Sequence, residues 1–286
     1  MAGVRIITDS ACDLSEELVQ AHGITVVPLT IRFGKEELVD RRDLSPAEFW
    51  ARCRTSSELP ETSAPAPGAF QAAYEQAAAD GADAVLCITL SAELSATFQS
   101  ATTAAAATSG IEVAVLDSRS VTMGQGLLAL TAAEAAEGGG ALADVRAVTE
   151  AAVPNTRVYG ALATLEHLVR GGRIGKARAL LGSMLSIKPV IEVRDGAVDE
   201  ESKQRTRGRS LEYLASKAAA DAPLRRLAVA SGEADDVPTL LGLLAGVPVT
   251  HPIEVVQLGP VVGTHAGPGT IGVCYQLESR PATSDD

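Results

Sequence analysis

Cysteine and histidine, the side chains that most often hold a metal ion, are few in this chain and lie far apart. The cysteines occur without any Cys-x-x-Cys spacing, at Cys12, Cys53, Cys87 and Cys274. The histidines are as dispersed, at His22, His167, His251 and His265. This scatter predicts inert thiols and no zinc site.

Positive charge and long apolar runs are also scarce. Lys and Arg number 24 against 36 Asp and Glu, a formal net charge of −12, which argues against a broad basic surface for nucleic acid and allows at most transient contact with an anionic membrane. No run approaches the roughly 20 apolar residues that span a bilayer, and the run in "MAGVRIITDS" is too short for a signal peptide. We therefore expect a soluble, cytoplasmic protein.

Nucleotide-binding motifs are missing as well. The chain has no Gly-x-x-x-x-Gly-Lys-Ser/Thr loop, and "MGQGLL" at 123–128 is too short for a dinucleotide fingerprint. A nucleotide cofactor is therefore not expected.

The first half of the 286 residues alternates β-rich runs with helical patterns. Strand-like runs at 4–8, 82–90 and 111–116 are each followed by a helical segment, the order typical of parallel βαβ units. A capping box at Ser45–Glu48 begins one helix, and Asp80-Gly81 ends another. We predict an α/β domain over 1–154 with a parallel, Rossmann-like sheet.

The second half follows a different pattern, which begins after "VPNT" at 153–156. It contains strand-like runs, two helical segments and Asp195-Gly196, a strong hairpin signal. The runs 253–263 and 270–278 are predicted as strands that flank a glycine-rich segment. We predict a second α/β domain over 155–280, with a mixed sheet flanked by helices, and a flexible tail at 281–286. The ligand pocket is expected between the two domains.

Hydroxyl-bearing side chains follow several predicted strands. They gather in "TDSACD", "LSAELSAT", "DSRSVTMGQG" and "TSAPAPG". Ligands of open parallel sheets bind beyond the carboxyl ends of the strands, so these loops predict a site for a small anion, either a carboxylate or a phosphate. Ser, Thr and Asp are also the ordinary N-cap residues, and that interpretation of each loop stays open.

The segment "VVGTHAGPGTIG" at 261–272 places His265 among glycines, which let backbone approach a ligand. A nearby carboxylate favours the charged imidazolium, so His265 is a candidate to supply the positive charge. A lone histidine in a loop is more often structural or exposed to solvent, and this second interpretation is also kept.

Taken in order, these motifs resemble the DegV family of fatty-acid-binding proteins. They are "TDSACDL", "TSAPAP", "LSAELSATFQSA", "DSRSVTMGQG", "HLVRGGRIG", "LSIKPVI" and "VVGTHAGPGTIG". The resemblance implies two α/β domains that bury a long-chain fatty acid such as palmitate, stearate or oleate between them, with no cofactor or metal. It also implies a carrier without catalysis of its own, which presents the carboxylate to a bacterial fatty acid kinase catalytic subunit for phosphorylation to acyl phosphate.

Residue by residue, the resemblance assigns roles to three groups of side chains. The fatty-acid carboxylate would bind at Thr62, Ser63, Ser95, His265 and Thr97. Val121 would line the acyl channel. Arg173, near the mouth, would serve the kinase together with Arg170. Two positions depart from the family pattern: Ala96 replaces the usual glycine, and "TSAPAP" lacks the usual glutamine before its proline.

Two groups of basic residues stand out in this acidic chain. The first, Arg170, Arg173, Lys176 and Arg178, suits an acidic partner or its nucleotide because it lies in the glycine-rich segment at the expected mouth. The second is more typical of a solvated face: Lys203, Arg205, Arg207 and Arg209.

Two other functional classes stay open. In one, the protein is a small-molecule hydrolase or phosphotransferase with His265 as general base or nucleophile, assisted by Asp9 or Asp117. In the other, it is a regulatory or scaffold protein with a small interdomain cavity.

Overall fold

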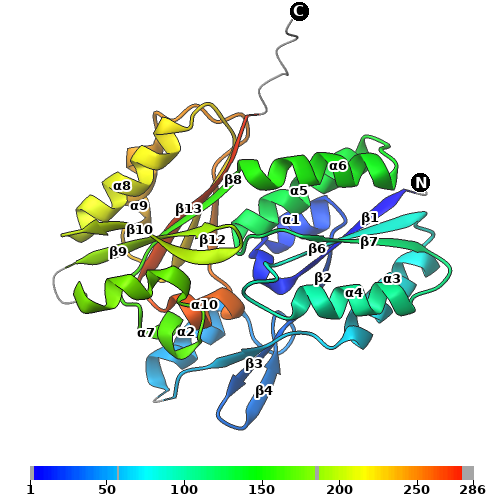
Figure 1. Ribbon diagram of the computed structural model, residues 1–286, viewed down its shortest axis with the longest axis horizontal. Coiled ribbons are helices and arrows are strands. Elements are labelled where there is room, and N and C mark those ends of the chain that lie inside the picture. Colours follow the sequence, from blue (N-terminus) through cyan, green and yellow to red (C-terminus); the bar gives the residue numbers. More distant parts are fainter. Residues whose placement is uncertain (1–2, 57, 184–186, 279–286) are drawn as a thin grey trace, which may run out of the picture.

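The computed structural model describes residues 3–56, 58–183 and 187–278, and its strands form three sheets. The two larger sheets lie side by side, and Figure 1 shows them on opposite sides of the molecule with α5 between them. The proposed flexible tail at 281–286 lies outside the described residues.

The first large sheet is parallel, as the alternation of strands and helices predicts. Its strand order is β2-β1-β6-β7. The strands are β1 (Val4–Asp9), β2 (Thr25–Val27), β6 (Ala84–Thr89) and β7 (Glu112–Asp117). Helices α3 (Pro67–Ala79) and α4 (Thr97–Ala107) pack on one face, and α5 (Met123–Glu137) and α6 (Leu142–Ala152) pack on the other.

The second large sheet is mixed, with strand order β10-β9-β8-β13-β11-β12. Among the strands of the described residues in this sheet, only β11 and β12 pair in parallel. Its strands are β8 (Thr156–Ala161), β9 (Lys188–Arg194), β10 (Ala197–Gln204), β11 (Leu224–Gly232), β12 (Glu254–Gln257) and β13 (Thr270–Leu277). Helices α8 (Arg207–Ala220) and α9 (Val237–Leu244) cover one face. Asp195 and Gly196 both have positive φ and join β9 to β10, so the predicted hairpin is confirmed.

A small antiparallel sheet and several short helices complete the fold. The sheet consists of β3 (Thr30–Phe33), β4 (Glu36–Val39) and β5 (Glu61–Ser63). The helices are α1 (Glu16–Ala21), α2 (Pro46–Thr55), α7 (Glu166–Arg170) and α10 (Pro260–Ala266), with 3₁₀ segments η1 (Ser10–Cys12), η2 (Val153–Asn155) and η3 (Gly175–Ser183). The predicted capping box of Ser45 and Glu48 opens α2. No helix of the described residues is long and apolar enough to cross a bilayer.

Helix α5 holds the two large sheets together. It is buried over most of its length and bonds to both of them. Gln125 Nε2 donates to Thr8 Oγ1 of β1 at 2.9 Å, and Thr131 Oγ1 donates to Gln276 Oε1 of β13 at 3.1 Å. One hydrophobic cluster consequently runs without interruption from the parallel sheet into the mixed sheet.

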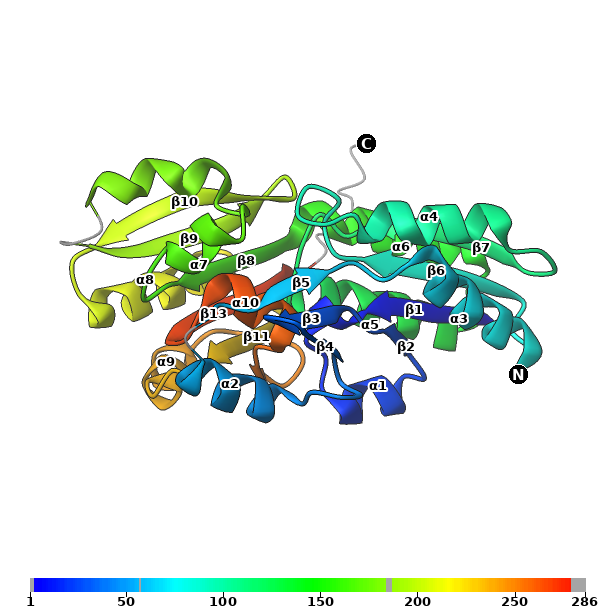
Figure 2. The same cartoon turned by 90° about the horizontal axis from the view of Figure 1, so that it is seen from below.

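One of the predicted strands is wrong. The run 253–263 was expected to be a single strand, but β12 ends at Gln257 and α10 begins at Pro260. Proline fits the first turn of a helix because it has no N–H to leave unpaired. The two valines that follow favour strands, yet Val261 is buried in the core on α10. His265 therefore lies in the last turn of a helix, and Figure 2 shows that helix beside β5.

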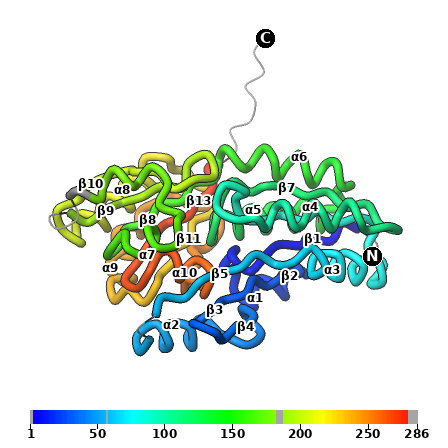
Figure 3. The backbone as a smooth tube through the Cα atoms, turned by 60° about the horizontal axis from the view of Figure 1, so that its bottom comes forward, coloured from blue at the N-terminus to red at the C-terminus, as the bar shows by residue number. Residues whose placement is uncertain are grey.

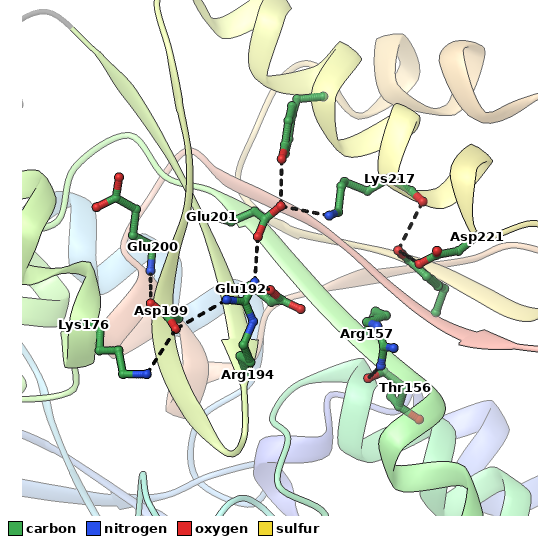
Figure 4. A network of polar contacts seen from close by, with 12 residues as sticks. Thr156, Arg157, Lys176, Glu192, Arg194, Asp199, Glu200, Glu201, Lys217 and Asp221 are labelled. Carbon is green, nitrogen blue, oxygen red and sulfur yellow. Dashed lines mark hydrogen bonds and ion pairs between the residues drawn. The ribbon is translucent and has the colours of Figure 1, made fainter.

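An ion-pair network fixes the β9–β10 hairpin to α8 (Figure 4). Glu201 accepts from Arg194 Nη2 at 3.1 Å, from Lys217 Nζ at 2.9 Å and from the Tyr213 hydroxyl at 2.7 Å. In the basic group expected to be a solvated face, Lys203, Arg205 and Arg209 are exposed, whereas Arg207 is half-buried and paired with Asp236. The contacts of Glu201 therefore join the mixed sheet to α8.

Asp40, buried after β4, provides a stability test whose sign depends on pH. Burial raises the pKa of its carboxyl from 3.8 to about 6, and Ser10 and Arg41 offset only part of that rise. The unfolded chain therefore ionises first, and stability falls as pH rises from about 4 to 6, by at most about 3 kcal/mol. We expect Asp40→Asn to raise the melting temperature at pH 7.5, and this gain to shrink towards pH 4 in thermal scans.

Asp43 is the matched control, with the opposite sign. It is exposed, and hydrogen bonds from Arg42 and from the Val39 N–H lower the pKa of its carboxyl to about 2. Its ionised form is therefore the stabilising one, so Asp43→Asn should lower the melting temperature at pH 7.5. An Asp40→Asn variant that melts earlier than the parent at pH 7.5 would contradict the role given to burial.

Candidate functional site: a cavity between the two sheets

A cavity of about 200 Å³ lies where the mixed sheet faces the loops of the parallel sheet. Most of its wall is apolar. Leu29, Leu90 and Val121 contribute from the first half of the chain, and Ile191 and Leu258 from the second. The cavity is thus a mainly apolar space enclosed by residues from both halves of the chain.

The floor of the cavity is a row of small residues across three neighbouring strands. Gly272 of β13 pairs in register with Gly160 of β8 on one side and with Ala230 of β11 on the other. Register partners share a face of the sheet, and all three line the cavity. The side chains missing from this row leave the space that a ligand can fill.

These floor residues are not among those that the sequence motifs predict. Glycine inside a β-rich run was the available signal, because it weakens a strand and often marks the close approach of a ligand. "VYGAL" and "TIGVCY" both carry it.

One polar end of the cavity is formed by Thr62 of β5 and His265 of α10. Thr62 Oγ1 and His265 Nε2 lie 2.9 Å apart, and His265 Nδ1 is buried without a partner among the described residues. A buried N–H without an acceptor is costly, so the favoured tautomer carries its hydrogen on Nε2 and donates it to Thr62. The hydroxyl hydrogen of Thr62 is then free to be donated to a ligand.

Ser95 supplies a second hydroxyl from the loop before α4. It lines the cavity, and its Oγ accepts from the Thr97 N–H at 3.3 Å and lies 2.9 Å from Thr97 Oγ1. Thr97 itself is fully buried and lies outside the cavity lining. It orients Ser95 instead of facing a ligand.

The positive charge at this end belongs to Arg173, not to His265 as expected. Burial, with Arg173 and His167 nearby, lowers the pKa of the His265 imidazole to about 4, so the ring is neutral at pH 7. Arg173 lines the cavity, donating from Nε to the Leu94 carbonyl at 3.0 Å and from Nη1 to the Gly171 carbonyl at 2.6 Å. The guanidinium is therefore held across the boundary between the two halves of the chain, beside the hydroxyls.

The remaining predicted residues take different positions. Val121 lines the cavity. Ser63 is exposed and outside the lining, because adjacent strand residues face opposite sides and Thr62 takes the inner one. Arg170 is exposed at the surface, where it pairs with Glu166 at 2.8 Å. Of the predicted carboxylate-binding residues, the structure thus brings Thr62, Ser95 and His265 to the cavity.

The alternative function, a small-molecule hydrolase or phosphotransferase, requires Asp9 or Asp117 to assist His265. Asp9 accepts from the backbone N–H groups of Ala11 and Leu90, and Asp117 accepts from those of Ala92 and Arg119. Neither carboxylate contacts His265 in the part of the chain that the structure describes. The "TDSACD" loop also stays out of the cavity lining, so only part of the predicted hydroxyl rim converges there.

Comparison with known proteins identifies chains of the same architecture. Residues 3–278 match the model of a family described as uncharacterised proteins of the DegV family. A DegV domain-containing protein of Streptomyces coelicolor is 36% identical over 275 residues, which cover 94% of this chain and 97% of that protein.

Two solved structures agree with the fold over almost the whole chain. One, described as showing fatty acid binding of a DegV family protein from Thermus thermophilus, has a TM-score of 0.87 at 35% identity and covers 96% of this chain and all of that one. The other, DegV from Bacillus subtilis, described as a fatty acid binding protein, has a TM-score of 0.86 at 31% identity, with 97% and 100% covered. The predicted α/β fold class, with a parallel and a mixed sheet, is confirmed.

Proposed function

The chain belongs to the DegV family, and we propose that it is a cytoplasmic carrier that binds one long-chain fatty acid, such as palmitate, stearate or oleate, in the cavity between its two sheets. The observation that carries this proposal is the division of the cavity into two parts. Its walls are mostly apolar, and Thr62, Ser95, His265 and Arg173 gather at one end. Related proteins described as fatty acid binding support the same conclusion.

The acyl chain supplies most of the affinity in this proposal. About 14 methylenes at roughly 0.8 kcal/mol each give on the order of 11 kcal/mol of gross transfer free energy, from which association subtracts several. The carboxylate accepts from the Thr62 and Ser95 hydroxyls, and the Arg173 guanidinium balances its charge. The neutral His265 holds the Thr62 hydroxyl in the orientation that donates to the ligand.

We further propose that the bound acid is presented to a separate fatty acid kinase catalytic subunit. A carboxylate oxygen would attack the γ-phosphorus of ATP held by the kinase. The new O–P bond forms as the bond to ADP breaks, which leaves acyl phosphate and ADP. The protein itself contributes no catalytic group in this scheme.

Organic extraction of the purified protein tests the binding proposal. We expect mass spectrometry to find a long-chain fatty acid at close to one per chain, because the cavity excludes water from the acyl chain. If no such lipid is found, and the delipidated protein takes up neither added palmitate nor oleate, the carrier proposal fails.

Arg173 tests the presentation proposal. We expect Arg173→Ala to lower acyl-phosphate formation tenfold or more, about 1.4 kcal/mol, because the guanidinium lies where charge builds up during transfer. The assay uses a bacterial fatty acid kinase catalytic subunit, ATP and saturating fatty acid, so that a weaker affinity does not limit the rate.

Arg209→Ala is the control, since Arg209 is an exposed arginine of the group assigned to the solvated face, pairs with Glu212 and lies outside the cavity lining. It should turn over at the parent rate. Normal turnover in Arg173→Ala would remove Arg173 from the transfer step, and a lowered melting temperature would assign it a structural role.

A further inference from the structure

A second, polar pocket of about 620 Å³ adjoins the polar end of the cavity. The two share Thr62, Arg173 and His265, so the hydrogen-bonded pair of Thr62 and His265 forms part of the wall of each. A carboxylate bound at Thr62 would therefore lie next to the polar pocket. The acyl chain would keep its place in the cavity.

The lining of this polar pocket combines three guanidinium groups with two carboxylates. The cations are Arg32, Arg170 and Arg173, and the acids are Glu58 and Glu61. Glu61 is paired with Arg32. The acid that pairs with Arg170 is Glu166, which lies outside the pocket lining, and Arg173 has only carbonyl partners among the described residues. Among the described residues, neither Arg170 nor Arg173 is thus paired with a carboxylate that lines the pocket.

His167 extends this polar wall. Its Nδ1 lies 3.3 Å from the Thr264 carbonyl, the natural acceptor for an Nδ1–H, which orients the ring at the edge of the pocket. The backbone of "RGGRIG" adds flexible glycines at the same edge, with Gly172 in the left-handed region. The pocket is therefore a concave polar surface with more positive than negative groups, next to a carboxylate site, in a protein of net charge −12.

We propose that this polar pocket binds the phosphate group of the acyl phosphate, with Arg170 and Arg173 as its principal ligands. The inference rests on the proposed function, because it concerns the product of that same site. Phosphorylation adds a tetrahedral group to the carboxylate and raises its charge towards two. Arginine pairs well with phosphate oxygens through its planar fork, so a second arginine suits the added phosphate, whereas the hydroxyls and Arg173 suffice for a carboxylate.

The specific consequence is a division of labour between two head-group sites. Thr62, Ser95 and Arg173 hold the acid, and Arg170 joins Arg173 in holding the phosphate after transfer. A carrier built in this way retains its product, which shields the reactive acyl phosphate from water until it is released. Arg170 should therefore matter for the phosphorylated ligand and not for the free acid.

Hexadecyl phosphate is a stable probe for this site, since it joins a palmitate-length chain to a phosphate without the labile acyl bond. We expect the delipidated parent to bind both hexadecyl phosphate and palmitate in a competition assay with a fluorescent fatty acid. Arg170→Gln should weaken hexadecyl phosphate about tenfold and leave palmitate within twofold. Arg178→Gln, the matched control, should change neither.

Equal changes for the two ligands in Arg170→Gln, or no change for either, would overturn the phosphate pocket while leaving fatty-acid binding intact. Failure of the parent to bind palmitate would instead overturn the proposed function, and the pocket inference with it. Inorganic phosphate is titrated separately. If inorganic phosphate displaces bound hexadecyl phosphate but not bound palmitate, the pocket also binds free phosphate. That result would support phosphate recognition at this site.

Discussion

Gly160→Leu is expected to abolish fatty-acid binding without unfolding the protein. A Cβ added at Gly160 would meet Ile191 Cγ1 at 3.6 Å, which is ordinary van der Waals contact, and the backbone there does not need positive φ. The strand can therefore accept the substitution. The remainder of the leucine side chain would extend into the cavity from its floor, in the space that the acyl chain would occupy.

The expected result is a loss of affinity of at least a hundredfold and no fatty acid in organic extracts of the purified variant. Gly208→Leu is the control, because a Cβ at Gly208 of α8 meets nothing within 4 Å and lies away from the cavity. Its lipid content should equal that of the parent. If Gly160→Leu keeps a stoichiometric fatty acid and its normal melting temperature, the acyl chain takes another path.

The double variant Thr62→Val with Ser95→Ala should show the next largest effect. Hydrogen bonds to a charged group are each worth about 1.5 to 3 kcal/mol, so removing both hydroxyls should cost about 3 to 6 kcal/mol, a loss of affinity of a hundredfold or more. Each single variant alone should weaken binding by roughly tenfold to a hundredfold. Isothermal calorimetry on delipidated protein measures these affinities.

Ser63→Ala provides the control for the double variant. Ser63 neighbours Thr62 on β5 but is exposed on the other side of the strand, so its hydroxyl should contribute nothing to binding. Unchanged affinity in the double variant would place the carboxylate at another part of the cavity. A loss in Ser63→Ala as large as that in Thr62→Val would show that β5 presents its side chains differently in solution.

Local sequence signals predicted the regular parts of the fold well and the part around His265 poorly. Alternating strands and helices, a capping box and an Asp-Gly turn are each encoded by neighbouring residues, and all three were recognised. The β-branched residues before His265 favour a strand on their own. What makes them helical is Pro260 at the first turn and the packing of Val261 into a core assembled from distant segments, which no local pattern reveals.

The candidate site was only partly predictable for a similar reason. The motifs pointed to Thr62, Ser95 and His265, and the structure brings these three to one cavity although they are far apart in sequence. The charge state of His265 depends on burial and on the nearby Arg173, both of which are tertiary properties. The exposed position of Ser63, in contrast, follows from strand alternation once β5 is recognised. Because β5 is only three residues long, its alternation is hard to recognise in the sequence.

Helix α5 has a consequence for how the whole chain folds and denatures. It bonds to β1 through Gln125 and to β13 through Thr131, while Glu134 pairs with Arg225 of β11 at 2.7 Å. The chain trace in Figure 3 shows α5 near the middle of the molecule, with segments of both halves around it. A fragment that ended near residue 154 would keep this helix but expose the side of it that β8, β11 and β13 cover. We therefore expect the two halves to unfold as one cooperative unit, so that a ligand bound between them would delay the melting of both at once.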